Sequence, residues 1–145
     1  EWKRAMSIDV DGVFYCSREA GRSMVRRGSG VIVNIGSIYS IVAAPNRASY
    51  CTSKAGVAML TRSLAVEWAS SGVRVNCIAP GYADTALLQA LAAEGKIDLA
   101  ALIKRTPSGK LTQPEDVAEV VGFLCDPRSK HITGQVLAVD GGWSA

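Results

Sequence analysis

Tyr50 and Lys54 are the two residues of this sequence whose types and spacing most directly suggest chemistry. In the segment Tyr50-Cys-Thr-Ser-Lys54, a phenol and an ammonium group lie four residues apart, which places them on one face of a helix. A tyrosine ordinarily loses its proton only near about pH 10, but a cation within about 4 to 6 Å favours the phenolate. The pair can therefore act as a proton-transfer site, although helices also carry such pairs by chance on solvated faces.

Three apolar runs predict the strands that would position this pair. The runs span residues 31–35, 73–79 and 135–140, and a glycine precedes each of them. Short β-branched runs of this kind are typical of buried parallel strands. Polar residues follow the first two runs, among them Ser37 and Thr85. They belong to the carboxyl ends of strands, which is where open α/β sheets bind their ligands.

Two long helical patterns alternate with these strands. Residues 2–27 carry apolar side chains at helical spacing, and we expect this face to pack on the sheet and the helix to end before Gly28. Its apolar positions are Met6, Val10, Val13 and Phe14. Residues 46–71 form a second pattern that carries the tyrosine–lysine pair in its first turns and stops at Gly72. The apolar positions of this pattern are Val57, Leu60, Leu64 and Trp68.

The remaining helical signals lie in the last third of the chain. Residues 112–115 resemble a capping box, which would open a helix that Asp126-Pro127 then breaks. One or two short helices are expected between Thr85 and Thr106. Strands and helices in alternation predict an α/β fold with a parallel sheet, because parallel strands need long crossovers. Three such strands would leave an exposed apolar edge and one uncovered face, so we expect further sequence to complete the fold.

The order and spacing of these motifs resemble the short-chain dehydrogenase/reductase family. The motifs are Gly36-Ser37, Tyr50 with Lys54, Val75-Asn76, Pro80-Gly81 with Thr85, and the closing segment 134–142. The resemblance covers essentially all 145 residues and implies the carboxyl-terminal, catalytic half of one Rossmann-like domain. Such a half has about three parallel strands of the doubly wound sheet with flanking helices. The nucleotide-binding half of the family, with its TGxxxGxG turn, has no counterpart in these residues.

The resemblance implies a role for each matching residue. Tyr50 would be the general acid in ketone reduction and the general base in alcohol oxidation, while hydride moves to or from the nicotinamide of NAD or NADP. Lys54 would favour the phenolate and hydrogen-bond the nicotinamide ribose. Ser37 would hold the substrate oxygen where charge develops. Besides Tyr50 and Lys54, the cofactor-binding residues would be Pro80, Gly81, Ala83 and Thr85.

Asp9 is the main departure from the family pattern. The family usually has an asparagine at this position, and its backbone carbonyl helps to hold a water in a proton relay to the lysine. If only the carbonyl is needed, the relay survives and Asp9 belongs to the catalytic set. A carboxylate at this position could instead neutralise the cation of Lys54. The choice between NAD and NADP stays open, because the discriminating residue belongs to the half that has no counterpart here.

Composition limits the partners and cofactors that we expect. Sixteen basic and thirteen acidic residues give a net charge of +3 that is spread along the chain, so no nucleic-acid partner is expected. No apolar run approaches the roughly 18 residues of a membrane span, and the only histidine, His131, has no companion for a metal site. Four cysteines without Cys-x-x-Cys spacing indicate small apolar residues in a reduced, cytoplasmic protein. They are Cys16, Cys51, Cys77 and Cys125.

The favoured interpretation is an oxidoreductase that acts on a small-molecule alcohol or ketone of the polyol, sugar or 3-oxoacyl type and forms a homodimer or homotetramer. Residues 86–93 would form a mainly aliphatic lid, with Gln89 and Glu94 as candidate polar contacts. Four residues after the catalytic serine would line the pocket, and Tyr82 would stand at its mouth. The four are Tyr39, Val42, Ala43 and Ala44.

Two alternative interpretations remain open at this stage. The chain as it stands can be a truncated, non-catalytic product that acts only in oligomer assembly through its two long helices. It can also be an epimerase or dehydratase relative, because such enzymes share the tyrosine–lysine pair. An enoyl reductase is less favoured, since those enzymes tend to space tyrosine and lysine further apart.

Overall fold

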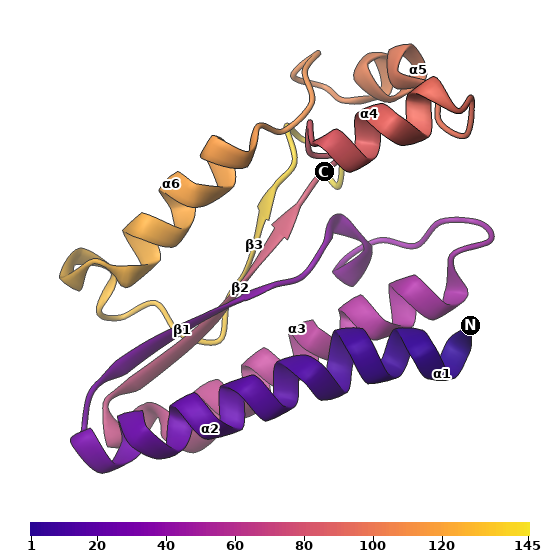
Figure 1. Ribbon diagram of the computed structural model, residues 1–145. Helices are drawn as coiled ribbons and strands as arrows, with labels where there is room; N and C mark the ends of the chain where they lie inside the picture. The colour runs from indigo at the N-terminus through magenta and orange to yellow at the C-terminus, as the bar shows by residue number, and fades with distance from the viewer.

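The computed structural model describes residues 1–145 and contains one three-stranded parallel sheet in the order β1-β2-β3 (Figure 1). The strands are β1 (Gly30–Ile35), β2 (Val73–Pro80) and β3 (Val136–Val139). In their register, Ile32 lies opposite Val75, and Cys77 lies opposite Val136. The predicted α/β fold with parallel strands is confirmed, and the three strands begin and end within a residue or two of the expected positions.

The amino-terminal helix follows the predicted range but contains an irregular turn. Helix α1 (Trp2–Ala5) continues through a π-helical turn (Met6–Asp11) into α2 (Gly12–Arg27). A π-helical turn holds an extra residue and often occurs at functional sites. This one contains Asp9, and the apolar periodicity gave no sign of it. The helix ends as expected at Gly28, whose φ of 72° lies in the left-handed region that favours glycine.

The packed face of α2 differs in part from the predicted one. Ser17 and Gly21 are its buried residues, and Met24 and Val25 pack against the core. Phe14, expected on this face, is 37% exposed. It contacts its own helix, with Tyr15 and Arg18 beside its ring.

Helix α3 (Ala48–Trp68) lies beside α2 on the same face of the sheet (Figure 1). Its predicted apolar face is confirmed, because Val57 and Leu64 are buried while Leu60 and Trp68 pack against the core that β2 shares. A 3-10 turn (Ala69–Ser71) leads to Gly72, where the left-handed φ of 72° ends the helix. Helix α3 begins two residues later than predicted, since Asn46 has a φ of 57°, which is not helical.

Helix α6 (Pro114–Cys125) covers the opposite face of the sheet and packs against β1 and β2 (Figure 1). The expectation of one uncovered face is therefore wrong. The predicted start of this helix is wrong by one residue, because Gln113 is the cap and its N–H donates to Asp116 Oδ2 at 2.8 Å. Pro114 suits the first helical position. The hydroxyl of Thr112 instead donates to the carbonyl of Val139 at 3.1 Å.

The segment between β2 and α6 lies beyond the carboxyl ends of the strands (Figure 1). It contains two short helices, as predicted, α4 (Ala86–Ala93) and α5 (Leu99–Arg105). The expected open edge is also present: β1 pairs with β2 alone, and Ile35 at its end is 47% exposed. None of the helices has the length and apolar character that a bilayer crossing requires.

All four cysteines are free thiols, but only one is buried. Cys77 lies inside β2 and is fully buried, as expected of a small apolar residue. Cys16 and Cys125 are exposed on helices α2 and α6, so the prediction that they act as apolar residues is wrong for these two. Each lies within a helical pattern but on its solvent side, which the pattern did not resolve.

Candidate active site

A pocket of about 370 Å³ lies at the carboxyl ends of β1 and β2, within the size range of small-molecule sites. Five of the predicted site residues line it: Ser37, Tyr50, Gly81, Ala83 and Thr85. The other three lie close by: Pro80 is the last residue of β2, Lys54 lies beside the Tyr50 ring, and Asp9 pairs with Lys54. The fold therefore gathers residues that lie up to 76 positions apart in the sequence, from Asp9 to Thr85.

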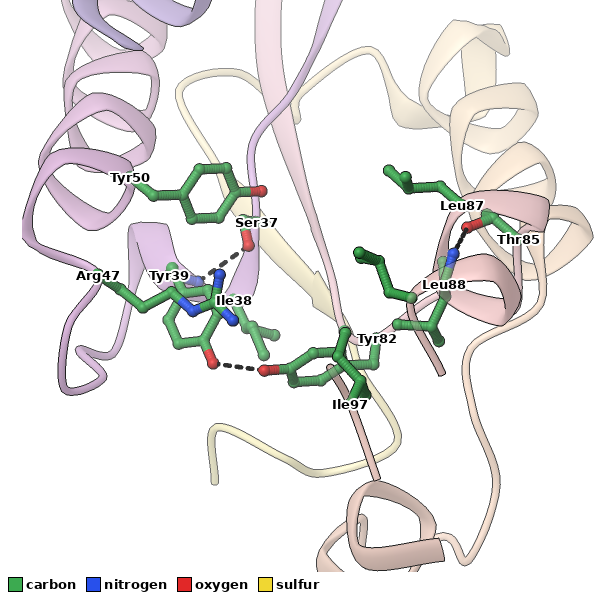
Figure 2. Close-up of a pocket in the computed structure, with 13 residues that line it drawn as sticks. Ser37, Ile38, Tyr39, Arg47, Tyr50, Tyr82, Thr85, Leu87, Leu88 and Ile97 are labelled. Carbon is green, nitrogen blue, oxygen red and sulfur yellow. Dashed lines mark hydrogen bonds between the residues drawn. The ribbon is translucent and has the colours of Figure 1, made fainter. Parts of the chain in front are cut away.

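Tyr50 and Lys54 lie in the first two turns of α3, as the sequence predicted. The ammonium nitrogen of Lys54 is 5.6 Å from the centroid of the Tyr50 ring. Tyr50 is 37% exposed and its phenol faces the pocket (Figure 2). The lysine is more enclosed, because only 14% of its side chain is exposed. A cation is thus held beside a phenol that a ligand can reach.

Ser37 follows β1 in an extended conformation and caps the 3-10 turn Ile38–Ser40. Its hydroxyl oxygen accepts a hydrogen bond from the N–H of Tyr39 at 3.2 Å, and its own N–H donates to Ser40 Oγ at 3.1 Å. The Ser37 hydroxyl donates to no group of the protein, so its hydrogen is free for a ligand. Figure 2 shows this hydroxyl facing the same space as the Tyr50 phenol. The two groups can therefore meet one substrate oxygen.

Ser40 and Gly36 fix the position of the Ser37 loop. The Ser40 hydroxyl donates to the carbonyl of Lys54 at 2.8 Å, which ties the loop to α3. A Cβ on Gly36 would approach both Ser40 Oγ and Cys77 Sγ to 2.8 Å, so a side chain there would displace its neighbours. This close packing explains a glycine at a position where many members of the family that the sequence resembles have serine.

Asp9 forms a direct ion pair with Lys54, with 3.4 Å between Oδ1 and Nζ. Its second oxygen accepts a hydrogen bond from the Ser53 hydroxyl at 2.8 Å. The π-helical turn places the carboxylate here, and only 21% of its side chain is exposed. This ion pair is the contact that the second of the two expectations for Asp9 requires, and the neutralisation of the Lys54 cation itself stays a prediction. Sequence reasoning did not identify Ser53.

Tyr39 and Tyr82 form a hydrogen-bonded pair across the pocket, with 2.8 Å between their hydroxyl oxygens (Figure 2). Burial and this hydrogen bond raise the pKa of Tyr39 to about 12. Tyr39 therefore stays protonated at neutral pH and is a poor proton acceptor. Its ring lies edge-on to that of Tyr50 at 6.0 Å between centroids. The pair was not predicted, because its members lie 43 residues apart and on different loops.

The loop after β2 forms the opposite wall of the pocket. A Cβ on Gly81 would come within 2.9 Å of the Asp140 backbone, so only glycine fits there without displacement. The Thr85 hydroxyl oxygen accepts from the N–H of Leu88 at 3.3 Å and caps α4. Its hydrogen is therefore free to donate to a ligand.

Several residues expected at the pocket lie elsewhere. Val42 and Ala43 line a separate hollow, and Ala44 packs against the buried Tyr39 and Trp143. Gln89 donates to Asp84 at 2.6 Å, and Glu94 forms an ion pair with Lys96 at 2.6 Å. Neither polar side chain lines the pocket. The direction of α4 explains this, since its pocket side carries leucines and its polar side chains face solvent. The leucines on the pocket side are Leu87, Leu88 and Leu91.

A comparison with protein-family profiles identifies the family of this chain. The profile described as enoyl-(acyl carrier protein) reductase, which belongs to the short-chain dehydrogenase/reductases, matches residues 1–144. This chain belongs to the short-chain dehydrogenase/reductase family. The resemblance drawn from the sequence motifs is thereby confirmed.

Individual short-chain dehydrogenase/reductases match over nearly the whole chain. This chain is 49% identical over 144 residues to cis-4-hydroxycyclohexanecarboxylate dehydrogenase of Sinomonas cyclohexanicum. It is 43% identical over 145 residues to galactitol 2-dehydrogenase (L-tagatose-forming) of Cereibacter sphaeroides. Each alignment covers 99% of this chain and 57% of the relative. The chain therefore spans little more than half the length of these relatives.

Solved structures of the family superpose closely on this one. The gluconate 5-dehydrogenase of Burkholderia cenocepacia J2315, in complex with NADP and tartrate, matches with a TM-score of 0.92 and 38% identity. That match covers 99% of this chain and 56% of the other. The three strands and their helices are accordingly those of a Rossmann-fold dehydrogenase.

Proposed function

We propose that the intact protein carrying this chain is an NAD(P)-dependent oxidoreductase that interconverts a secondary alcohol and its ketone. The observation that carries this proposal is the pocket wall shared by Ser37 and Tyr50, with the ammonium nitrogen of Lys54 5.6 Å from the centroid of the Tyr50 ring. The names of the similar dehydrogenases support it. The family resemblance of the sequence motifs gives the substrate class as a small molecule of the polyol, sugar or 3-oxoacyl type, and the lining of the pocket bears on the choice among these.

In ketone reduction, Tyr50 gives its proton to the carbonyl oxygen, and Ser37 donates a hydrogen bond to the same oxygen. A nicotinamide nucleotide, when bound, supplies the hydride that reaches the carbonyl carbon, so two electrons and two hydrogens enter the substrate. In alcohol oxidation, Tyr50 accepts the proton instead. Lys54, although it is paired with Asp9, lies 5.6 Å from the centroid of the Tyr50 ring and stabilises the negative charge that Tyr50 carries between these steps.

The residues after β2 fit a nicotinamide ring beside Tyr50. Gly81 lines the pocket and lets the loop pack closely against Asp140, and the Thr85 hydroxyl has a hydrogen to donate to a carboxamide. With Pro80, Ala83 and Lys54, these residues would hold the cofactor.

We also propose that residues outside this chain bind the nucleotide phosphates, within the same Rossmann-like domain. None of the three strands is followed by a TGxxxGxG turn, which is the element that cradles a pyrophosphate. The share of the relatives that the chain covers supports this division. NAD and NADP are both compatible with it.

We further propose that the intact protein forms a homodimer or homotetramer through its two long helices. Apolar side chains are exposed along α1, α2 and α3, and such surfaces commonly mark protein interfaces. They include Trp2, Phe14, Met59 and Val66. Sedimentation of the intact protein as a monomer would refute this.

The decisive experiment is the substitution Tyr50→Phe in the intact protein. We expect turnover to fall by at least about 10²-fold, because a positioned acid/base contributes at least that much. The measurement is the steady-state rate of nicotinamide-linked ketone reduction. Tyr15→Phe, on the exposed surface of α2, is the matched control and should leave the rate unchanged. A Tyr50→Phe enzyme with full activity would contradict the proposed role.

A further inference from the structure

Arg47 is the one charged residue among those that line the pocket. It is the N-cap of α3 and precedes Tyr50 by three residues. Figure 2 shows its guanidinium extending toward Tyr39, on the same side of the pocket as Tyr50 and Ser37. A permanent positive charge therefore borders the space where the substrate oxygen would lie.

The backbone of Arg47 is fixed, whereas its side chain is unengaged. Asn46 before it adopts a left-handed φ of 57°, and the carbonyl of Arg47 accepts the N–H of Cys51 at 2.8 Å in the first turn of α3. The guanidinium itself makes no hydrogen bond or ion pair with the protein. Its five N–H donors are free for a ligand.

The nearest candidate carboxylates are committed to other groups. Arg47 also borders a neighbouring hollow that contains Glu1 and Asp9. Asp9 pairs with Lys54, and Glu1 accepts from the Ser49 hydroxyl at 3.4 Å. Neither forms an ion pair with Arg47, so no internal anion neutralises it.

The rest of the pocket wall is mostly apolar. Leucines of α4 and Ile97 face Ser37 and Tyr50 across the pocket (Figure 2). A polyhydroxylated substrate would lose hydrogen bonds to water against this wall without replacement, which is costly. An aliphatic ring or short chain would instead gain from burial there.

We propose that Arg47 binds a carboxylate of the substrate, so that the substrate is a compact hydroxy acid or keto acid whose two polar ends are joined by an aliphatic scaffold. The planar guanidinium matches a carboxylate with two parallel hydrogen bonds. The oxygen at the other end of the scaffold meets Ser37 and Tyr50. This inference rests on the proposed function, because it assigns the substrate class of that same pocket.

The test compares a keto acid with a neutral ketone of similar shape. The probes are 4-oxocyclohexanecarboxylate and 4-methylcyclohexanone, reduced by the intact protein with NADH or NADPH. Arg47→Met, which keeps an apolar stem without the charge, should lower kcat/KM for the keto acid by about 10- to 100-fold. The value for the neutral ketone should change by less than about threefold, and Lys130→Met, at an exposed position after α6, should change neither.

Equal losses for both probes in Arg47→Met, or no loss for the keto acid, would overturn the assignment while leaving the oxidoreductase proposal intact. Absence of activity on any ketone would count against the proposed function instead. A binding measurement decides the inference in that case: calorimetric titration with cyclohexanecarboxylate and with cyclohexanecarboxamide, neither of which can react. The wild type should prefer the carboxylate and Arg47→Met should not. A wild type without that preference would refute the role of Arg47.

Discussion

The chain contains four tyrosines, and their surroundings decide which one can exchange a proton with a ligand. Tyr15 lies on the exposed surface of α2, and the hydroxyl groups of Tyr39 and Tyr82 are hydrogen-bonded to each other. Tyr50 alone combines a place on the pocket wall with a neighbouring ammonium group. The residue type is thus common in the chain, and its environment gives it a chemical role.

Asp140 illustrates how a single carboxylate holds the carboxyl-terminal turn. It accepts hydrogen bonds from the N–H of Gly142 at 2.9 Å and from both the N–H and the hydroxyl of Ser144, at 2.9 and 2.6 Å. Burial raises the pKa of Asp140, but the hydrogen bonds from Ser144 and Gly142 outweigh it and hold the pKa below its usual value. Folding therefore favours the ionised form.

Asp140→Asn should lower the free energy of unfolding of the intact protein by about 2 kcal/mol at neutral pH, since hydrogen bonds to a charged acceptor are lost. The contribution of the Asp140 carboxylate to the free energy of unfolding is complete above the unfolded-state pKa of about 3.9. It is lost as the pH falls from there through the lower pKa of Asp140 in the folded state. Urea unfolding at a series of pH values checks this. Asp11→Asn, at an exposed site, serves as the control. A difference between wild type and Asp140→Asn that persists unchanged at pH 2 would contradict the explanation.

Helices α2 and α3 approach closely because one of them offers a glycine at the contact. A Cβ on Gly21 would overlap the indole ring of Trp68. The two helices together cover one face of the sheet, so their distance also sets where the first turn of α3 lies. A change in the packing at this contact would shift α3, the helix that carries Tyr50 and Lys54.

Gly21→Ala should destabilise the intact protein by about 1 to 3 kcal/mol, because the added methyl group displaces a large side chain in a packed contact. Gly122→Ala in α6 is the matched control, since nothing lies within 4 Å of a Cβ there. That control should stabilise the protein by about 0.5 to 1 kcal/mol through helix propensity. Thermal unfolding of both variants measures the difference, and equal effects would argue against a tight contact.

The elements that the sequence predicted well are those with local causes. Gly28 and Gly72 end their helices because a left-handed φ is a property of the glycine itself. The π-helical turn has no such local signal. The Tyr39–Tyr82 bond and the aim of Arg47 into the pocket depend on loops that meet only after folding. Ser37, Tyr50 and Lys54 could be named in advance because their spacing resembles a family motif, whereas pocket neighbours such as Val42 were misplaced.

In the proposed enzyme, the molecule as a whole would supply one wall of a dinucleotide site rather than a closed site. The nicotinamide would lie in the pocket beside Tyr50, and the chain has no TGxxxGxG turn to hold a pyrophosphate. Catalysis and nucleotide binding are therefore divided along the sequence in the proposed enzyme.

The 145-residue chain produced by itself should bind NAD and NADP more weakly than about 1 mM, because phosphate contacts supply much of the affinity of such sites. Titration calorimetry of the isolated chain tests this, with the intact protein as the positive control. Micromolar binding by the isolated chain would show that its own residues hold the phosphates.

The unpaired edge of β1 has a consequence for handling the chain in solution. Its six residues, Gly30–Ile35, include no charged residue and no proline, and four of them are β-branched. Such a strand displays a row of free N–H and C=O groups and is a template on which another strand can grow. Two copies of the chain that meet along this edge would extend the sheet from one molecule to the next. The isolated chain should consequently form β-rich assemblies in concentrated solution unless a further strand pairs with β1.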